Sequence, residues 1–202
     1  MMLKFTSQPP LTPYQKHRKQ WIDCQKCDLC EVRNKVVLLR GMLPAPILFV
    51  GEAPGPSEDV IGKPFVGPAG HLLDLIIERG VDGQYDYAIT NLVGCIPLDD
   101  GSKKAPEPPK ASIAACAPRL VEVIQLCQPR VIVMVGRLAE KHVPILFKQP
   151  WPDRQFVKIM HPAAILRMDV SQQGLAVQRC TIALSDVVDD LTDGDLLIPQ
   201  LR

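Results

Sequence analysis

Seven cysteines are the first residues of this sequence whose type and spacing could do chemistry. Three of them, Cys24, Cys27 and Cys30, form the run C-Q-K-C-D-L-C. A C-x-x-C spacing lets two thiolates face one metal, and thiolates bind both Zn²⁺ and iron–sulfur clusters. The odd number of cysteines and the lack of an export signal argue against a disulfide framework. The run therefore predicts a metal or cluster site, with a redox dithiol as the alternative.

A complete site of this kind needs further ligands from distant parts of the chain. Cys95 and Cys116 are the natural pair, because each lies beside the boundary of an expected element. Cys127 follows an apolar helical pattern, and Cys180 lies inside another. Both are therefore expected to be buried as small hydrophobic side chains. Cys30 stays open, either as a spare thiol or as a replacement for one of the distant ligands.

A second group of polar residues follows four short apolar runs, which we expect to be strands of a parallel sheet. The strands are expected at 46–50, 87–90, 130–135 and 156–160, and they are followed by 51–59, Asn91, 136–137 and 161–164. Open α/β sheets bind ligands beyond the carboxyl ends of their strands. Carboxylates, an amide, an arginine and an imidazole are therefore expected to converge on one edge.

Each of these residues also has a simpler structural explanation. Asn91 could cap a turn, and His161 could cap the helix that begins after Pro162. The segment GEAPGPSED matches neither the dinucleotide-binding pattern nor the P-loop, which removes the main support for nucleotide-cofactor chemistry.

The four strands alternate with helical patterns at 70–79, 111–128, 137–142 and 171–191. This alternation predicts an α/β fold, a three-layer α/β/α sandwich around a central, mostly parallel four-stranded sheet. A short helix at 13–24 is expected within a basic N-terminal segment, 1–23, as a solvated face or a phosphate-contacting arm. Residues 99–109 are expected to be a loop, and 192–202 a peripheral tail of a single domain spanning 1–202.

The composition agrees with one globular domain. Lys+Arg 23 and Asp+Glu 22 give a net charge of +1, and 47% of the residues are hydrophobic, which excludes wholesale disorder. No apolar run reaches the roughly 18 residues that span a bilayer, and a signal-peptide pattern is lacking. We therefore expect no membrane association and a cytoplasmic location. The near-neutral charge means that any nucleic-acid contact must use a local patch.

Several motifs occur together in a fixed order, and their order is more informative than any one of them. They are GEAPGPSED, GKPFVGPAGHLLD, ITN and HPAAILR, with C-x-x-C upstream and Cys95 and Cys116 among them. From about Cys24 to Arg167 the sequence resembles the family 4 uracil-DNA glycosylases, the iron–sulfur members of the uracil-DNA glycosylase superfamily. The resemblance implies a monomeric α/β/α enzyme of base excision repair. Such an enzyme hydrolyses the N-glycosidic bond of a flipped-out uracil in single- or double-stranded DNA.

The resemblance also implies a role for each matched residue. Glu52 and Glu58 would position or polarise the attacking water, and His161 would donate a hydrogen bond to a uracil oxygen. Phe65 would stack on the extruded uracil, and Asn91 would read its polar edge. Two further residues of the first motif, Ala53 and Gly55, would contact the substrate.

Four cysteines and several surface residues complete the implied site. Cys24, Cys27, Cys95 and Cys116 would ligate a 4Fe–4S cluster with a structural role, and zinc is the alternative. The Gly-Pro turns would bring rigid backbone close to DNA phosphates. The implied DNA-binding residues are Pro56, Gly67, Pro68, Lys103, Lys104, Arg137 and Arg167.

The segment after Cys95 departs from the family pattern. Where the family carries a basic, proline-rich stretch, Gly94 and Ile96 flank the cysteine, and Asp99 and Asp100 follow. This difference keeps open a second hypothesis, a catalytically weak iron–sulfur relative that binds DNA and recognises another lesion or a protein partner. An iron–sulfur electron carrier would explain the cysteines but not the aromatic, amide and imidazole side chains together.

Overall fold

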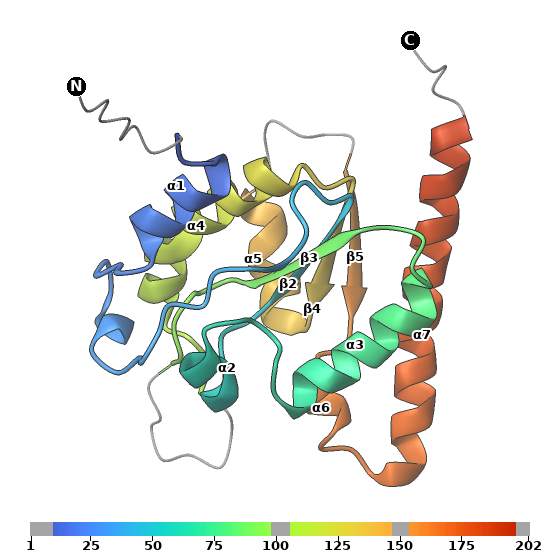
Figure 1. Cartoon of the computed structure of the whole chain (residues 1–202). Helices are drawn as coiled ribbons and strands as arrows, with labels where there is room; N and C mark the ends of the chain where they lie inside the picture. The colour runs from blue at the N-terminus through green and yellow to red at the C-terminus, as the bar shows by residue number, and fades with distance from the viewer. Residues whose placement is uncertain (1–9, 98–105, 147–153, 197–202) are drawn as a thin grey trace, which may run out of the picture.

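The computed structural model describes residues 10–97, 106–146 and 154–196, which form three layers (Figure 1). The middle layer is a five-stranded sheet with the order β1–β3–β2–β4–β5. Four strands are parallel and confirm the prediction: β2 (Ile47–Gly51), β3 (Tyr87–Asn91), β4 (Val131–Val135) and β5 (Gln155–Ile159). The sequence did not predict β1 (Arg40–Gly41), a two-residue strand that pairs antiparallel with β3.

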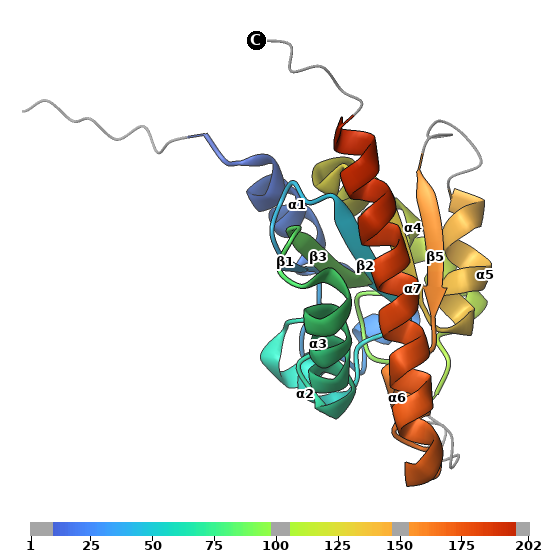
Figure 2. The same cartoon turned by 90° about the vertical axis from the view of Figure 1, so that its right-hand side faces the viewer.

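Helices cover both faces of the sheet (Figure 2). They are α1 (Pro13–Trp21), α2 (Pro56–Ile61), α3 (Pro68–Val81), α4 (Lys110–Cys127), α5 (Arg137–Leu146), α6 (Pro162–Ile165) and α7 (Val170–Leu196), with a 3₁₀ turn η1 (Asp28–Cys30). Among the described helices, none is long and apolar enough to cross a membrane.

The central strands are apolar throughout because both of their faces are buried. Along β2, Ile47 and Phe49 face the core under α3 and α7, whereas Leu48 and Val50 face the core under α4 and α5. This alternation follows from the two-residue period of a strand. The continuous apolar runs in the sequence therefore predicted the central strands correctly.

The helix boundaries differ from the predicted ones for local reasons. A capping box between Thr12 and Gln15 starts α1, which ends at Trp21, before the predicted limit. Gly67 is the N-cap of α3, and Pro68 occupies its first turn, so the helix starts two residues earlier than expected. The pattern at 137–142 marks the first turns of α5, which continues to Leu146.

The parallel register aligns the strand ends at one edge of the sheet. Gly51 at the end of β2 pairs with Asn91 at the end of β3, and Val135 pairs with Ile159. The residues that follow these strands therefore emerge side by side, as the sequence predicted.

Candidate active site and cysteine-lined cavity

Phe65, Asn91 and His161, here called the recognition triad, lie together at this edge. The rings of Phe65 and His161 have centroids 5.8 Å apart and planes inclined by 32°. The surroundings of Gly51 show that Phe65 and Asn91 also lie close together. A β-carbon at residue 51 would lie 2.5 Å from Phe65 Cε2 and would clash with the side-chain oxygen of Asn91. Residue 51 must therefore be glycine, because the Phe65 ring and the Asn91 amide close over its α-carbon.

Phe65 adopts a backbone conformation that is unusual for a large side chain. Its φ is +53°, in the left-handed region, and its side chain is buried. Such a conformation costs about 1–3 kcal/mol unless the surroundings impose it. Two sets of contacts hold this backbone. Glu58 Oε1 accepts from the amides of Val66 at 2.8 Å and Gly67 at 2.9 Å. In addition, the α-carbon of Gly70 packs against the Phe65 carbonyl.

Glu58 holds two loops together rather than one. Its second oxygen accepts from the amide of Gly55 at 3.1 Å, at the start of α2. The carboxylate thus joins the loop after β2 to the turn that carries Phe65. These contacts favour a positioning role for Glu58 over the expected contact with the attacking water.

Asn91 is almost fully buried, with 2% of its surface exposed, and its side-chain oxygen has no hydrogen-bond partner among the described residues. Buried polar atoms are nearly always paired, so an unpaired one at a sheet edge indicates a ligand that donates a hydrogen bond. The amide carries both donors and acceptors, and it can read a ring edge that presents both.

His161 is the N-cap of α6, and the cap fixes its tautomer. The Nδ1 atom accepts from the amide of Ala163 at 3.2 Å, so in the neutral ring the proton is on Nε2. Burial, with the nearby charge of Arg167, lowers the pKa of His161 to about 4, although Glu58 opposes the shift. At neutral pH the side chain is therefore an uncharged hydrogen-bond donor.

Glu52 follows β2 and is half-buried at the same edge. Burial and the charge of Glu107 raise the pKa of Glu52, whereas Arg137 and Arg167 lower it. The net effect is a carboxylate that is a stronger base than an exposed one, as deprotonation of a water requires.

The residues expected to contact DNA lie at helix ends near this edge. Pro56 and Pro68 occupy the first turns of α2 and α3 and are exposed, while Gly67 is buried. Arg137 begins α5, and Arg167 follows α6; both are exposed. Lys103 and Lys104 lie outside the described residues. Ala53 and the half-buried Gly55 belong to the loop that contains Glu52.

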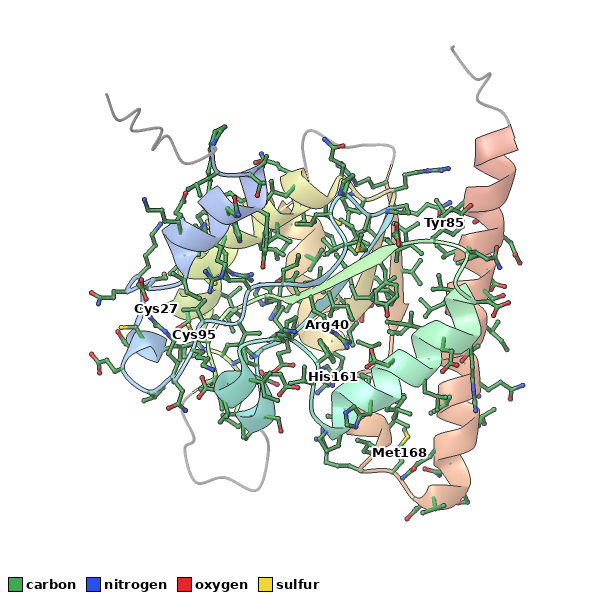
Figure 3. All side chains as sticks on the ribbon, viewed as in Figure 1. Cys27, Arg40, Tyr85, Cys95, His161 and Met168 are labelled. Carbon is green, nitrogen blue, oxygen red and sulfur yellow. The ribbon has the colours of Figure 1, made fainter. Side chains whose placement is uncertain are left out.

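The cysteines form a second region, away from His161 (Figure 3). One cavity is lined by Cys24, Cys27, Cys95 and Cys116 together with apolar residues such as Trp21. Cys30 is not among the lining residues. Within the described parts of the chain, no three His, Cys, Asp or Glu side chains form a group that could hold a single metal ion.

Charged groups surround these four sulfur atoms. Burial raises the pKa of Cys95 to about 11; Arg33 opposes the shift, and Cys116, Cys27 and Cys24 reinforce it. Arg33 also donates to the carbonyl of Cys24 at 2.6 Å. Because thiolates are the metal ligands, a bound cation would have to displace the proton of Cys95.

The two remaining cysteines are structural, which confirms the sequence prediction. Cys127 is the last residue of α4 and is fully buried, and its sulfur donates to the carbonyl of Ala45 at 3.3 Å. Burial raises its pKa to about 11. Cys180 is buried on the inner face of α7.

Comparison with known proteins agrees with this geometry. Residues 40–184 match the family model described as the uracil DNA glycosylase superfamily. A type-4 uracil-DNA glycosylase from Archaeoglobus fulgidus is 32% identical over 166 residues, which cover 73% of this chain and 80% of the relative. This chain belongs to the type-4 family of the uracil DNA glycosylase superfamily. The matched region 40–184 contains the whole recognition triad and the two distant cysteines, Cys95 and Cys116.

Two further type-4 uracil-DNA glycosylases are more similar over shorter stretches. The Sulfurisphaera tokodaii protein is 38% identical over 130 residues, covering 64% of this chain and 57% of the relative. The Saccharolobus solfataricus protein is 40% identical over 127 residues, covering 62% and 55%. The chain therefore spans little more than half the length of these two relatives.

Two polar residues of this type-4 chain were missed in the sequence. Asp59 is buried and accepts from the backbone amide of Asn34 at 3.0 Å and from its side chain at 2.5 Å, which ties the segment after the cysteines to α2. Arg119 is buried in α4. In sequence both look like ordinary surface charges. Arg119 lies within an apolar stretch of the predicted helix 111–128, whereas Asp59 lies in α2, which was not predicted.

Proposed function

We propose that this protein excises uracil from DNA by hydrolysing the N-glycosidic bond and leaving an abasic site. The observation that carries the proposal is the meeting of Phe65, Asn91 and His161 at the carboxyl edge of the sheet. An aromatic ring, an unpaired amide and a neutral imidazole are the groups needed to stack, read and polarise a pyrimidine. The family membership and the names of the relatives support the same activity.

Recognition begins with extrusion of the nucleotide, because the bond cannot be reached inside a duplex, and extrusion costs a few kcal/mol. Stacking on Phe65 returns about 1–3 kcal/mol of that cost. The imposed backbone of Phe65 holds its ring in place before the base arrives. The unpaired oxygen of Asn91 accepts from the ring N–H of uracil, which cytosine lacks, so the amide discriminates between the two.

Departure of the base is assisted by His161. As the bond breaks, the sugar gains positive charge and the uracil gains negative charge. The Nε2–H of a neutral imidazole donates to the uracil oxygen that receives this charge, and the bond strengthens in the transition state. The helix-cap contact to Ala163 keeps that proton on Nε2.

Water is activated by Glu52 in this proposal. Its raised pKa suits proton abstraction, and its negative charge stabilises the cationic sugar. Glu58 instead sets the shape of the loops around the base through its three backbone contacts. The exposed Arg137 and Arg167, with the helix starts at Pro56 and Pro68, suit contacts to the DNA backbone.

We assign an iron–sulfur cluster to the four cavity cysteines. A tetrahedral Zn²⁺ with bonds of about 2.3 Å would need its four sulfurs within about 3.8 Å of one another. The four cysteines line one cavity, and four cysteine thiolates are also the ligand set of a 4Fe–4S cluster, which the family resemblance implies. A 4Fe–4S cluster held by these cysteines would link three segments, the loop after α1, the loop after β3 and α4, without touching the substrate.

We also propose that the chain acts as a single-domain monomer. All described strands belong to one sheet, which supports the single domain. Sedimentation of the iron-loaded protein with and without DNA would test the monomer: a mass near 22.3 kDa is expected without DNA.

The activity is tested with single- and double-stranded oligonucleotides that carry one uracil, followed by alkali. Strand breakage at the uracil and none at a matched thymine is expected. Absence of breakage at any protein concentration, with the iron content intact, contradicts the proposal. DNA binding without base release would instead support the catalytically weak relative.

A further inference from the structure

Arg119 is a buried cation that contacts a cysteine of the cavity. Only 1% of its surface is exposed, and among the described residues no carboxylate accepts a hydrogen bond from it. A buried charge is costly unless hydrogen bonds satisfy it, so the contacts of this guanidinium are important for its position. Its Nε donates to Cys116 Sγ at 3.1 Å, which ties the guanidinium to the wall of the cysteine cavity.

The other end of the same guanidinium holds the end of β3. Nη2 donates to the carbonyls of Asn91 and of Leu92, the latter at 3.2 Å. Nη1 donates to Thr90 Oγ1 at 3.1 Å. The planar arrangement of arginine donors makes these contacts simultaneous, which a lysine cannot do.

Asn91 is the residue of the recognition triad that this contact supports. Its side-chain oxygen has no partner among the described residues. Its backbone carbonyl is fixed by Arg119. A displaced guanidinium would therefore move the amide that faces the base.

We propose that Arg119 is a positioning residue that couples Cys116 to Asn91, so that uracil recognition depends on the state of the cysteine cavity. This inference rests on the proposed function for its biological meaning, although the coupling itself is a property of the fold. A displacement of Cys116 shifts the guanidinium through the bond at Nε, and the shift reaches Asn91 of the recognition triad through one side chain.

The test compares Arg119→Lys with Glu122→Gln. Glu122 lies on the same helix one turn later, but it binds His17 and Trp21 of α1 instead of β3. Both iron-loaded variants are bound to two DNAs, one with a non-cleavable 2′-fluoro-deoxyuridine and one with a tetrahydrofuran abasic site. Amide hydrogen exchange of residues 89–93 is measured in parallel, without DNA.

Arg119→Lys is expected to weaken binding of the uracil analogue about tenfold, as for one charged hydrogen bond, and to leave abasic binding unchanged. Exchange at 90–93 rises in Arg119→Lys and not in Glu122→Gln. An equal loss for both DNAs, or unchanged exchange, overturns the inference. If the wild type binds the uracil analogue no better than abasic DNA, the proposed function is wrong. The exchange measurement still tests the coupling between Arg119 and residues 90–93 in that case.

A second measurement needs no variant. By reciprocity, uracil bound at Asn91 must change the environment of Cys116 if the two are coupled. The reduction potential of the wild-type cluster is expected to differ between complexes with the uracil analogue and with abasic DNA. Identical potentials in the two complexes contradict the coupling.

Discussion

The recognition triad and the cysteine cavity are built in different ways. The triad comes from the ends of parallel strands and from the turn after α2, and a rigid sheet sets its geometry. The cavity comes from the loop after α1, the loop after β3 and the middle of α4. One region is ordered by backbone pairing, whereas the other is held by apolar packing and by side-chain contacts such as those of Glu122 with α1. The comparison teaches that a bound group would add bonds chiefly to the second region, where side chains rather than a sheet set the geometry.

The largest effect is expected where the cavity loses a ligand. Cys95→Ser should lose most of the bound iron and, with it, the order of the loops and the activity, because a buried thiolate cannot be replaced without cost. Iron content and excision are measured together.

Cys30→Ser is the matched control, because Cys30 does not line the cavity. It should keep its iron. Equal iron loss in both variants would show that Cys30 is a ligand, and the contrast between the two regions would need revision.

His161→Ala should break the triad without touching the cavity. Loss of a donor to a developing anion costs about 2.7–4 kcal/mol, which is a 10²–10³-fold slower single-turnover excision. Iron content and DNA affinity should stay close to those of the wild type. His142→Ala, on α5, serves as control; equal losses in rate and affinity would mean that the imidazole only holds DNA.

The same side chain predicts a pH effect on stability. The pKa of His161 is about 4 in the folded protein and 6.5 in its ordinary state. The unfolded chain therefore binds the proton first, and the stability present above pH 6.5 is lost as pH falls toward 4. Urea unfolding across this window should show a smaller loss in His161→Ala than in the wild type. An equal loss of unfolding free energy in the two proteins would contradict an uncharged imidazole at His161.

Phe65→Ala should weaken binding of the uracil analogue by about ten- to a hundredfold, since stacking contributes about 1–3 kcal/mol per base. Binding to abasic DNA should change little, because that DNA has no base to stack. Fluorescence anisotropy measures the affinity for each of the two DNAs. An equal loss of affinity for both would mean that Phe65 contributes to general DNA binding.

The smallest effect is expected for Asp59→Asn, which acts between the two regions. Replacing this acceptor of Asn34 should lower the free energy of unfolding by about 1–3 kcal/mol, the usual cost of leaving buried donors unpaired. Excision should fall less than in the triad variants. Asp74→Asn is the control, because its half-exposed ion pair with Arg40 contributes only about 0–1 kcal/mol.

The sequence predicted what depends on local patterns. Continuous apolar runs gave the four parallel strands, and parallel register then brought Asn91 and His161 to one edge. It could not predict β1, the left-handed backbone of Phe65 or the buried positions of Asp59 and Arg119. The buried positions of Asp59 and Arg119 depend on partners far along the chain, such as Asn34 and Asn91, and the turn at Phe65 depends on the contacts of Glu58.

The departure around Cys95 also has a partial structural explanation. A β-carbon at Gly94 would lie 3.2 Å from Val36 Cγ1 and 3.2 Å from the carbonyl of Val37, so the position has little room for a side chain. A larger side chain at this position would require the neighbouring segment to shift. The acidic residues that follow lie outside the described part of the chain.

The central claim is tested most directly by a crystal structure of the iron-loaded protein with DNA that contains 2′-fluoro-deoxyuridine. The base is expected to stack on Phe65, with Asn91 Oδ1 and His161 Nε2 each about 3 Å from its polar atoms. A flipped base that contacts none of the three side chains, or a base that stays in the duplex, would contradict the account.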